Sequence, residues 1–297
     1  MSAKSKQHPQ AQEPKKSSSK PEDREMRAVL DELSAITPLH AIQGKNINNF
    51  LGGRVVEHTT LTGQILAIKA HSGITRSEGD MMHYAATHGV LAPRVRAVYD
   101  ILIAGSGGPP LSRAMVSERV PGVPLADVWL TMSAADQAAI KQQLRLQLVT
   151  MRACTQPYIG RPDRQPTRNI FESMGDTYIG PFASERAFDN WCVLRVFGTP
   201  LMRFKWWRWL GKERKKHGKA KFVLTHGDLS PRNIIVQGNL VTGIIDWERS
   251  GFFPEYAEYA IAMMLCPGHE EWWIAVLQEL LPHCTDQRLE FTELVEG

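Results

Sequence analysis

Two short stretches of this sequence decide how the rest is interpreted: Thr225-His226-Gly227-Asp228-Leu229-Ser230-Pro231-Arg232-Asn233 and Ile244-Ile245-Asp246-Trp247-Glu248. Each stretch follows an apolar run, which predicts that each loop leaves a short buried strand. Asp228 and Asn233 are 5 residues apart, and Asp246 comes 13 residues after Asn233. An Asp and an Asn at that spacing on one loop can face the same cleft, and the next hairpin can bring a second Asp to its opposite wall.

The three oxygen-bearing side chains suit the transfer of a phosphoryl group. A carboxylate can orient an attacking hydroxyl and accept its proton, while Asn and Asp oxygens are ligands that Mg²⁺ prefers. The alternative is ordinary turn chemistry, since Asp and Asn favour turns and strand ends on their own. Both fragments together, in this order, favour a catalytic site, because kinase catalytic loops have the same Asp-to-Asn spacing and a later metal-binding Asp.

The same two stretches resemble the Brenner motif and the metal-binding motif of the aminoglycoside phosphotransferase/choline kinase family. Weaker matches are found at Pro121–Leu125, Gly180–Phe182 and Gly251–Tyr256. The resemblance extends over roughly residues 54–259, and only the motifs around Asp228 and Asp246 are highly specific. It implies an α+β fold of the bilobal, protein-kinase-like type, with a small β-rich N-lobe and a larger, mainly helical C-lobe.

The resemblance also implies roles for the three residues and the cofactors ATP and Mg²⁺. Asp228 is expected to be the catalytic base, and Asn233 and Asp246 are expected to be the Mg²⁺ ligands. The expected reaction moves the γ-phosphate of ATP to a hydroxyl of a small molecule. Two alternatives remain open, a catalytically idle kinase-fold binding or scaffold protein and a protein kinase.

Further nucleotide contacts are expected from the N-lobe. Lys69 ends the apolar run Ile65–Lys69, where a kinase-like fold places its phosphate-binding lysine, and Glu78 opens the next helix as its ion-pair partner. Glu78 could instead serve only as a favourable charge at a helix N-terminus. Residues 117–120 are expected to form the hinge, with the backbone of Glu118 and Val120 against the adenine.

Two departures from the family pattern concern the nucleotide. The sequence has no GxGxxG loop, and Gly52-Gly53 is the nearest substitute, although paired glycines also simply make turns. Trp247-Glu248 replaces the usual Phe-Gly after the metal-binding Asp, which suits small-molecule kinases better than protein kinases.

The chain divides into three expected segments: a disordered basic tail (1–24), the N-lobe (25–118) and the C-lobe with the catalytic and metal-binding loops (119–297). Propensity and periodicity predict a hairpin, a helix and two strands in the N-lobe. The expected helices span 25–39, 75–88, 133–154, 182–196, 256–265 and 271–281, and the expected strands span 54–57, 64–70, 95–104, 113–118, 222–225, 234–236 and 241–245.

Composition is that of an ordinary globular protein, with 43% hydrophobic and 22% charged residues. No apolar run reaches the roughly 18 residues of a membrane span. The four cysteines (Cys154, Cys192, Cys266 and Cys284) form no CxxC pair, so we expect free thiols in the cytoplasm rather than a zinc or disulfide framework.

The net charge of +4 is concentrated in one segment, since residues 203–221 alone carry +8 and the rest of the chain −4. Basic residues among tryptophans could bind nucleic acid or a lipid surface. The preferred interpretation is a solvated helix with Trp206, Trp207 and Trp209 packed inward. The family resemblance implies a hydroxyl-bearing small molecule as the partner, cationic amines included. We expect a monomer without nucleic-acid or membrane binding.

Overall fold

The structure is a computed structural model that describes residues 44–50, 53–102, 111–171, 177–218, 221–265 and 270–296. Several expectations fall on residues outside these ranges: the tail 1–24, the helix 25–39, the glycine- and proline-containing loop 105–110, Gly52, Lys219 and Cys266.

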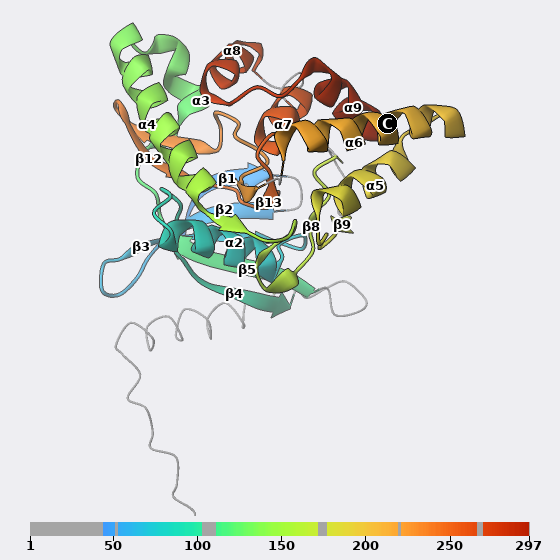
Figure 1. The fold of residues 1–297 in the computed structure, drawn as a ribbon. Helices are drawn as coiled ribbons and strands as arrows, with labels where there is room; N and C mark the ends of the chain where they lie inside the picture. The colour runs from blue at the N-terminus through green and yellow to red at the C-terminus, as the bar shows by residue number, and fades with distance from the viewer. Residues whose placement is uncertain are drawn as a thin grey trace, which may run out of the picture.

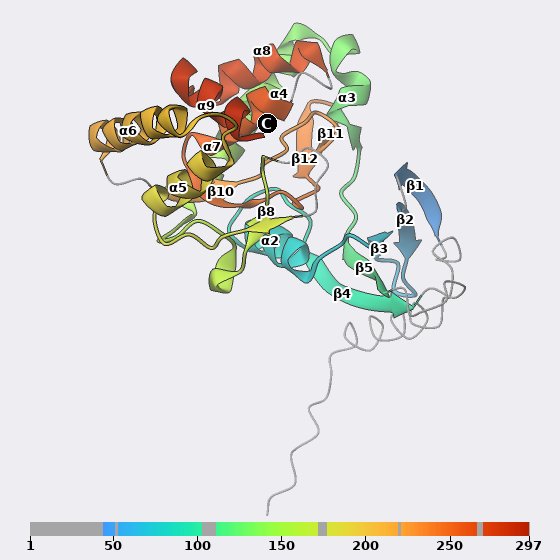
Figure 2. The ribbon, with the colours of Figure 1, turned by 90° about the vertical axis from the view of Figure 1, so that its right-hand side faces the viewer.

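The N-terminal part is an antiparallel five-stranded sheet in the order β1-β2-β3-β5-β4 (Figure 2). Its strands are β1 (Lys45–Phe50), β2 (Gly53–Thr59), β3 (Ile65–His71), β4 (Val95–Leu102) and β5 (Leu111–Glu118). The last four match the expected strands closely. The first, β1, was not predicted, because its sequence is polar and five of its six residues are exposed, so it lacks the apolar alternation of a half-buried strand.

Alternation along β3 separates the two faces of this sheet. Leu66, Ile68 and Ala70 are buried in a small apolar cluster with residues of β2, β4 and β5. Successive side chains of a strand point to opposite faces. Lys69 is consequently turned to the other face, toward helix α2 (Arg76–Thr87) and the rest of the molecule.

Helix α2 lies between the sheet and the helical part of the chain (Figures 1 and 2). It begins at an N-cap, because the Thr75 hydroxyl accepts a hydrogen bond from the Glu78 N–H at 3.2 Å. It ends before Gly89, whose φ of +87° is easily reached only by glycine. Met81, Met82 and Ala85 bury its inner face in the main core, which positions Glu78 in the first turn beside Lys69.

The C-terminal part carries helices around short strands (Figure 1). The elements are β6 (Val123–Pro124), α3 (Leu125–Val128), η2 (Trp129–Thr131), α4 (Ala134–Ala153), β7 (Thr155–Gln156), η3 (Pro162–Arg164), β8 (Thr167–Arg168), β9 (Tyr178–Ile179), α5 (Glu185–Arg195), α6 (Pro200–His217), β10 (Phe222–Thr225), β11 (Ile234–Gln237), β12 (Leu240–Ile244), β13 (Gly251–Pro254), α7 (Ala257–Leu265), α8 (Glu271–Leu280) and α9 (Asp286–Glu296). Strands β6, β11 and β12 form one small sheet, and β7, β10 and β13 form another.

Two helices, α5 and α9, differ from the sequence-based expectation. Helix α5 begins at Glu185 rather than at Phe182, because the backbone of Phe182 is extended and pairs with Ile159. The Ser184 hydroxyl then caps the helix by accepting the Ala187 N–H at 3.2 Å. Helix α9 was not predicted, and it packs against α7 and α5 at the end of the chain.

Three tryptophans of α6 were predicted to pack inward, and the prediction is wrong for one of them. Trp206 and Trp209 pack against the core, but Trp207 is 41% exposed. With Leu201 and Phe204, Trp207 lies on an outer face of the helix that also carries exposed Lys205 and Arg208. Among the described residues, no helix is long and apolar enough to cross a membrane.

Candidate active site

The loop that carries Asp228 and Asn233 follows strand β10, and a buried carboxylate binds the backbone of its first residues. Glu258, on α7, accepts hydrogen bonds from the backbone N–H groups of His226 at 2.6 Å and Gly227 at 3.0 Å. Gly227 has a φ of +80°, and a Cβ there would lie 2.8 Å from the Arg249 carbonyl oxygen. Only glycine fits this close approach, which fixes how the chain enters Asp228.

His226 is fully buried and joins the two functional loops. Its Nδ1 accepts the Asp228 N–H at 3.2 Å, so the ring proton must be on Nε2, which donates to the Ile245 carbonyl oxygen at 3.0 Å. Both ring nitrogens are therefore used in backbone hydrogen bonds. His226 therefore has a structural role, and Asp228 is the carboxylate available in this loop.

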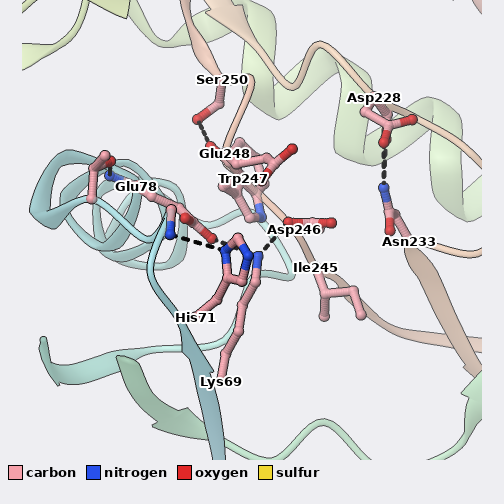
Figure 3. Close-up of polar contacts among 12 residues, drawn as sticks. Lys69, His71, Glu78, Asp228, Asn233, Ile245, Asp246, Trp247, Glu248 and Ser250 are labelled. Atoms are coloured by element: carbon pink, nitrogen blue, oxygen red, sulfur yellow. Dashed lines mark hydrogen bonds and ion pairs between the residues drawn. The ribbon is translucent and has the colours of Figure 1, made fainter. Parts of the chain in front are cut away.

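Asp228 and Asn233 are paired at the start and end of the loop (Figure 3). The Asn233 Nδ2 donates to both the side-chain Oδ2 and the backbone carbonyl of Asp228, each at 3.0 Å. This orients the amide so that its oxygen, the atom able to bind a cation, is not the one used by Asp228. The Asn233 carbonyl also accepts the Ile245 N–H at 2.8 Å, which ties this loop to the one that carries Asp246.

Asp246 follows strand β12 and points toward the N-terminal sheet (Figure 3). Its φ is +67°, a left-handed conformation that Asp tolerates better than most residues. Lys69 Nζ lies 2.8 Å from Asp246 Oδ1 and 2.9 Å from Glu78 Oε1. One ammonium group thus connects β3, α2 and the loop after β12, which are far apart in the sequence.

The ion pairs change the protonation of the groups involved. Burial lowers the pKa of Lys69, but the carboxylates of Asp246 and Glu78 outweigh it and raise that pKa well above its usual value. Burial raises the pKa of Glu78 in spite of Lys69. Burial also opposes ionisation of Asp246, but the Lys69 ammonium prevails, and the pKa of Asp246 falls below its ordinary value. Asp246 is therefore ionised at neutral pH, as a metal ligand has to be.

The residues present fit a magnesium ion bound together with a nucleotide. Mg²⁺ is usually held by one or two protein oxygen ligands plus phosphates and waters, rather than by a full protein cage. Asp246 and Asn233 supply two such oxygens, and the Asp246 side chain is 36% exposed. Among the described residues there is no cluster of three or more His, Cys, Asp or Glu side chains suited to a metal.

Trp247, which replaces the expected Phe, is a packing residue. Its side chain is fully buried, its Nε1 donates to the Ile244 carbonyl at 2.9 Å, and its ring meets His226 edge-on at 4.7 Å between centroids. The two loops are therefore supported by a shared aromatic contact beneath the polar groups.

The hinge segment lies at the end of β5. The Glu118 N–H donates to the Arg94 carbonyl at 3.0 Å and the Arg119 N–H donates to the Ile65 carbonyl at 3.3 Å, so both amides are occupied. The Glu118 carboxylate pairs with Arg96 at 2.8 Å. Val120 is buried, and its carbonyl accepts a hydrogen bond from the Arg119 side chain.

Glycine is required at Gly53, in the region expected to replace a phosphate loop. A Cβ there would lie 2.4 Å from the Phe50 ring and 2.9 Å from the Ala70 carbonyl oxygen. The close packing of β1, β2 and β3 explains this glycine without a ligand.

Glu258 and Arg161 are the two buried residues beside the loops that sequence reasoning missed as parts of the site. The partners of the Glu258 carboxylate are the backbone amides of His226 and Gly227. Arg161 lies in the connection before β8 and binds the segment after Asp246 through backbone carbonyls. Backbone partners leave no pattern in the sequence, so no signal pointed to either residue.

Comparisons with known proteins agree with this geometry. The sequence model of a family described as "phosphotransferase enzyme family" matches residues 54–287. Aminoglycoside 3'-phosphotransferase of Streptomyces fradiae is 26% identical over 233 residues, covering 74% of this chain and 77% of the relative.

Solved structures show the same fold. The apo form of a thermostable mutant of aminoglycoside phosphotransferase APH(4)-Ia aligns with a TM-score of 0.53 and 17% identity, over 85% of this chain and 83% of the other. A ternary complex of that enzyme with ADP and hygromycin B aligns with a TM-score of 0.55 and 14% identity, over 91% and 88% of the two chains. The fold is thus the bilobal, protein-kinase-like α+β fold, and the chain belongs to the phosphotransferase enzyme family.

Proposed function

We propose that this protein is a Mg²⁺- and ATP-dependent phosphotransferase that moves the γ-phosphate to a hydroxyl of a small molecule. The observation that carries the proposal is the arrangement around Lys69, whose ammonium is held between Glu78 and Asp246. The Asp228–Asn233 pair lies across from it on the adjoining loop (Figure 3). An idle scaffold would have no need to retain all five of these polar groups.

Each residue has a proposed task. Lys69 binds the nucleotide phosphates, and Glu78 holds the Lys69 side chain in place. Asn233 and Asp246 are the proposed magnesium ligands, and the ion, when bound, neutralises charge on the phosphates. The backbone of the hinge at Glu118 and Val120 is proposed to hold the adenine, with Val120 supplying the N–H because the amides of Glu118 and Arg119 are occupied.

Asp228 is the proposed general base. It orients the acceptor hydroxyl and takes its proton while the hydroxyl oxygen forms a bond to the γ-phosphorus. The bond between that phosphorus and the β–γ bridging oxygen breaks, and ADP leaves. Trp273, on α8, donates from its Nε1 to the Leu229 carbonyl at 2.8 Å, which supports the residue next to Asp228 from the C-lobe side.

The proposed lobes meet at the end of β5. We assign residues 25–118 to the N-lobe and 119–297 to the C-lobe, with the basic tail 1–24 preceding both. The nucleotide would then be bound between Lys69 and Glu78 of one lobe and Asp228, Asn233 and Asp246 of the other.

The acceptor can be searched for by following ATP consumption over a panel of hydroxyl-bearing amines, aminoglycosides and neutral metabolites. With an acceptor found, Asp228→Asn should lower turnover by on the order of 10²- to 10⁴-fold and leave Mg–ATP affinity nearly unchanged. Asp80→Asn is the matched control, because Asp80 is an exposed carboxylate on the outer side of α2. Normal turnover in Asp228→Asn would remove Asp228 from this role.

The idle-scaffold alternative is tested without an acceptor. Ligand binding to the folded state stabilises it by about 2.7 kcal/mol at a hundredfold excess over Kd. A melting temperature that does not respond to millimolar Mg–ATP would favour the scaffold over the enzyme.

A further inference from the structure

Arg161 contacts two elements of the proposed site at once. It is 1% exposed, and each of its three guanidinium nitrogens donates a hydrogen bond. Nη1 donates to the Ser77 hydroxyl at 2.5 Å, Nε donates to the Ser250 carbonyl at 3.0 Å, and Nη2 donates to the Glu248 carbonyl. Ser77 directly precedes Glu78 on α2, while Glu248 and Ser250 follow Asp246 in the chain.

The backbone around Arg161 is anchored to the same loop. Gly160 and Phe252 exchange two hydrogen bonds, with N···O distances of 3.1 and 2.8 Å, and the Arg161 N–H donates to the Gln165 carbonyl at 2.9 Å. Thr167 adds a second donor to the Ser250 carbonyl at 3.1 Å. Several hydrogen bonds therefore hold Arg161 to the segment around Ser250 and Phe252. Its hydrogen bond to the Ser77 hydroxyl connects that segment to α2.

The outer side of α2 is not covered by the core. A groove of about 490 Å³ lies between α2, β4 and the turn at 161–165, and Ser77, Gly79 and Arg161 are among its lining residues. Where the groove is open, no side chains of the described residues pack against this side of α2 to hold the helix in place. The hydrogen bond from Arg161 to Ser77 can hold the first turn of α2 there.

The Arg161 guanidinium donates hydrogen bonds to uncharged groups. All three partners of Arg161 are neutral oxygens, so no direct ion pair offsets the cost of burying the cation. Burial accordingly lowers the pKa of Arg161, with the more distant Tyr178, Glu78 and Glu248 acting in the opposite direction. Three hydrogen bonds at fixed angles to two elements are what a guanidinium provides and an ammonium does not.

We infer that Arg161 is a positioning residue that couples helix α2 to the loop 246–250. It keeps the Glu78, Lys69 and Asp246 side chains in fixed relative positions, so that the phosphate-binding and metal-binding groups lie close together. This inference rests on the proposed function, since it assigns Arg161 to the same site. Arg161 itself touches none of the reacting groups.

The experiment compares Mg²⁺-dependent ATP binding among variants by calorimetry, with and without Mg²⁺. Arg161→Met should weaken the Mg²⁺-dependent part of ATP affinity by about 10- to 100-fold, the range found for residues that orient metal ligands. ATP affinity without Mg²⁺ should change little. Arg161→Lys should recover only part of the loss, because one ammonium cannot bridge both elements. Ser77→Ala should give a smaller loss of the same kind.

Arg76→Met is the matched control, because it removes a guanidinium from the same turn of α2. Arg76 binds the Val98 carbonyl at 2.9 Å and Asp100 at 2.8 Å, both on β4, and its side chain is 60% exposed. We expect Mg²⁺-dependent ATP binding within about twofold of the wild type, since a surface ion pair contributes little.

The outcomes separate the possibilities. If Arg161→Met loses melting temperature but keeps wild-type Mg²⁺ dependence per folded molecule, Arg161 is structural and the inference is wrong. If Arg161→Met does not fold, Ser77→Ala decides by the same measurement.

A second readout needs no ligand. In Ser77→Ala, amide hydrogen exchange should rise together in α2 and in residues 246–250, and a rise confined to α2 would also overturn the coupling. If the wild type itself shows no Mg²⁺-dependent ATP binding, the proposed function fails. Hydrogen exchange would still report whether the two elements are coupled.

Discussion

Two buried charge networks in this molecule have opposite character. At the proposed active site, one ammonium, Lys69, serves two carboxylates, and one of these, Asp246, is 36% exposed. Between α5, α6 and α9, two guanidinium groups serve two carboxylates. There Arg214 and Arg288 both bind Asp189, and Arg288 also approaches Glu185 at 4.0 Å.

The second network closes around its central carboxylate, while Arg214 and Glu185 at its edge keep 17% and 13% of their side-chain surface exposed. Asp189 is 1% exposed, and each of its two oxygens has its own arginine. The Arg288 guanidinium also lies over the Tyr256 ring at 4.3 Å and the Trp209 ring at 5.4 Å. Burial raises the pKa of Asp189 even against Arg288 and Arg214, whereas the pKa of the partly exposed Asp246 is lowered by Lys69.

The difference indicates what each network is for. Charges that are equal in number and closed to solvent hold helices together and leave no group for a ligand. An ammonium outnumbered by carboxylates, open on one side, retains negative charge where a cation and a nucleotide can enter. Exposure and balance of charge therefore separate a binding site from a structural ion-pair network better than the presence of buried charge does.

The largest expected effect comes from breaking the open network at its exposed carboxylate. Asp246→Asn keeps the side-chain shape and tolerates the left-handed backbone, but removes the charge that a magnesium ligand needs. The Mg²⁺-dependent increment in ATP affinity per folded molecule should fall by at least about 100-fold. Calorimetry with Mg²⁺ and with a chelator measures the increment, and its full retention would show that Asp246 is not a ligand.

An Asp-to-Asn substitution in the network around Asp189 should instead lower the stability of the fold and leave nucleotide binding unchanged. Asp189→Asn leaves the buried Arg288 and the partly buried Arg214 without their shared carboxylate, which should lower the free energy of unfolding by about 3–5 kcal/mol. Urea unfolding checks this, and Mg–ATP affinity per folded molecule should be unchanged. Asp100→Asn is the control, because Asp100 also binds two arginines, Arg76 and Arg113, but at the surface. An equal destabilisation by both variants would contradict the role assigned to burial.

The two networks should also respond to pH with opposite signs. An ordinary Asp has a pKa of about 3.9. The lowered pKa of Asp246 contributes stability that is present above that value and is lost as the pH falls through the folded-state pKa. The raised pKa of Asp189 contributes stability that is present below it and is lost as the pH rises through the folded-state pKa.

Melting temperatures of the wild type, Asp246→Asn and Asp189→Asn, taken from about pH 3 to pH 7, isolate the two contributions. The difference between the wild type and Asp246→Asn should increase with pH at the acid end. The difference between the wild type and Asp189→Asn should decrease as the pH rises above about 4. Slopes of the same sign would show that the two carboxyl groups do not differ as described.

The smallest effect is expected from charges that belong to neither network. Lys212, Lys215 and Lys216 are exposed on α6, and Lys216 pairs with Glu213 at 3.1 Å. Changing all three to Gln should leave the unfolding midpoint and Mg–ATP affinity at the wild-type values, because exposed charges contribute little. A clear loss of either would mean that the outer face of α6 is part of a larger functional surface.

The sequence was sufficient to predict the two loops of the proposed active site. Asp228, Asn233 and Asp246 follow apolar strands at fixed spacings, so their proximity could be predicted from local pattern alone. Lys69 and Glu78 could be placed because strand alternation and an N-cap fix which way each side chain points. In the structure Lys69 pairs with Glu78 and Asp246, and Asn233 pairs with Asp228.

What could not be predicted depends on partners without a sequence signature. Strand β1 forms by pairing with β2, despite a polar sequence. Trp207 points outward on a helix that is aromatic on two faces, so periodicity could not choose its side. Arg161 and Glu258 act through backbone groups of segments far away in the chain.

The left-handed backbone of Asp246 has a consequence for how this protein could change over evolutionary time. Of the residues reachable by one nucleotide change from an Asp codon, Asn and Gly accept such a φ readily, while Val and Ala are strained there. A descendant freed from the need to bind magnesium would keep its fold most easily by passing through Asn or Gly. Loss of catalysis would then leave the loop, and the surface it presents, intact for a new use.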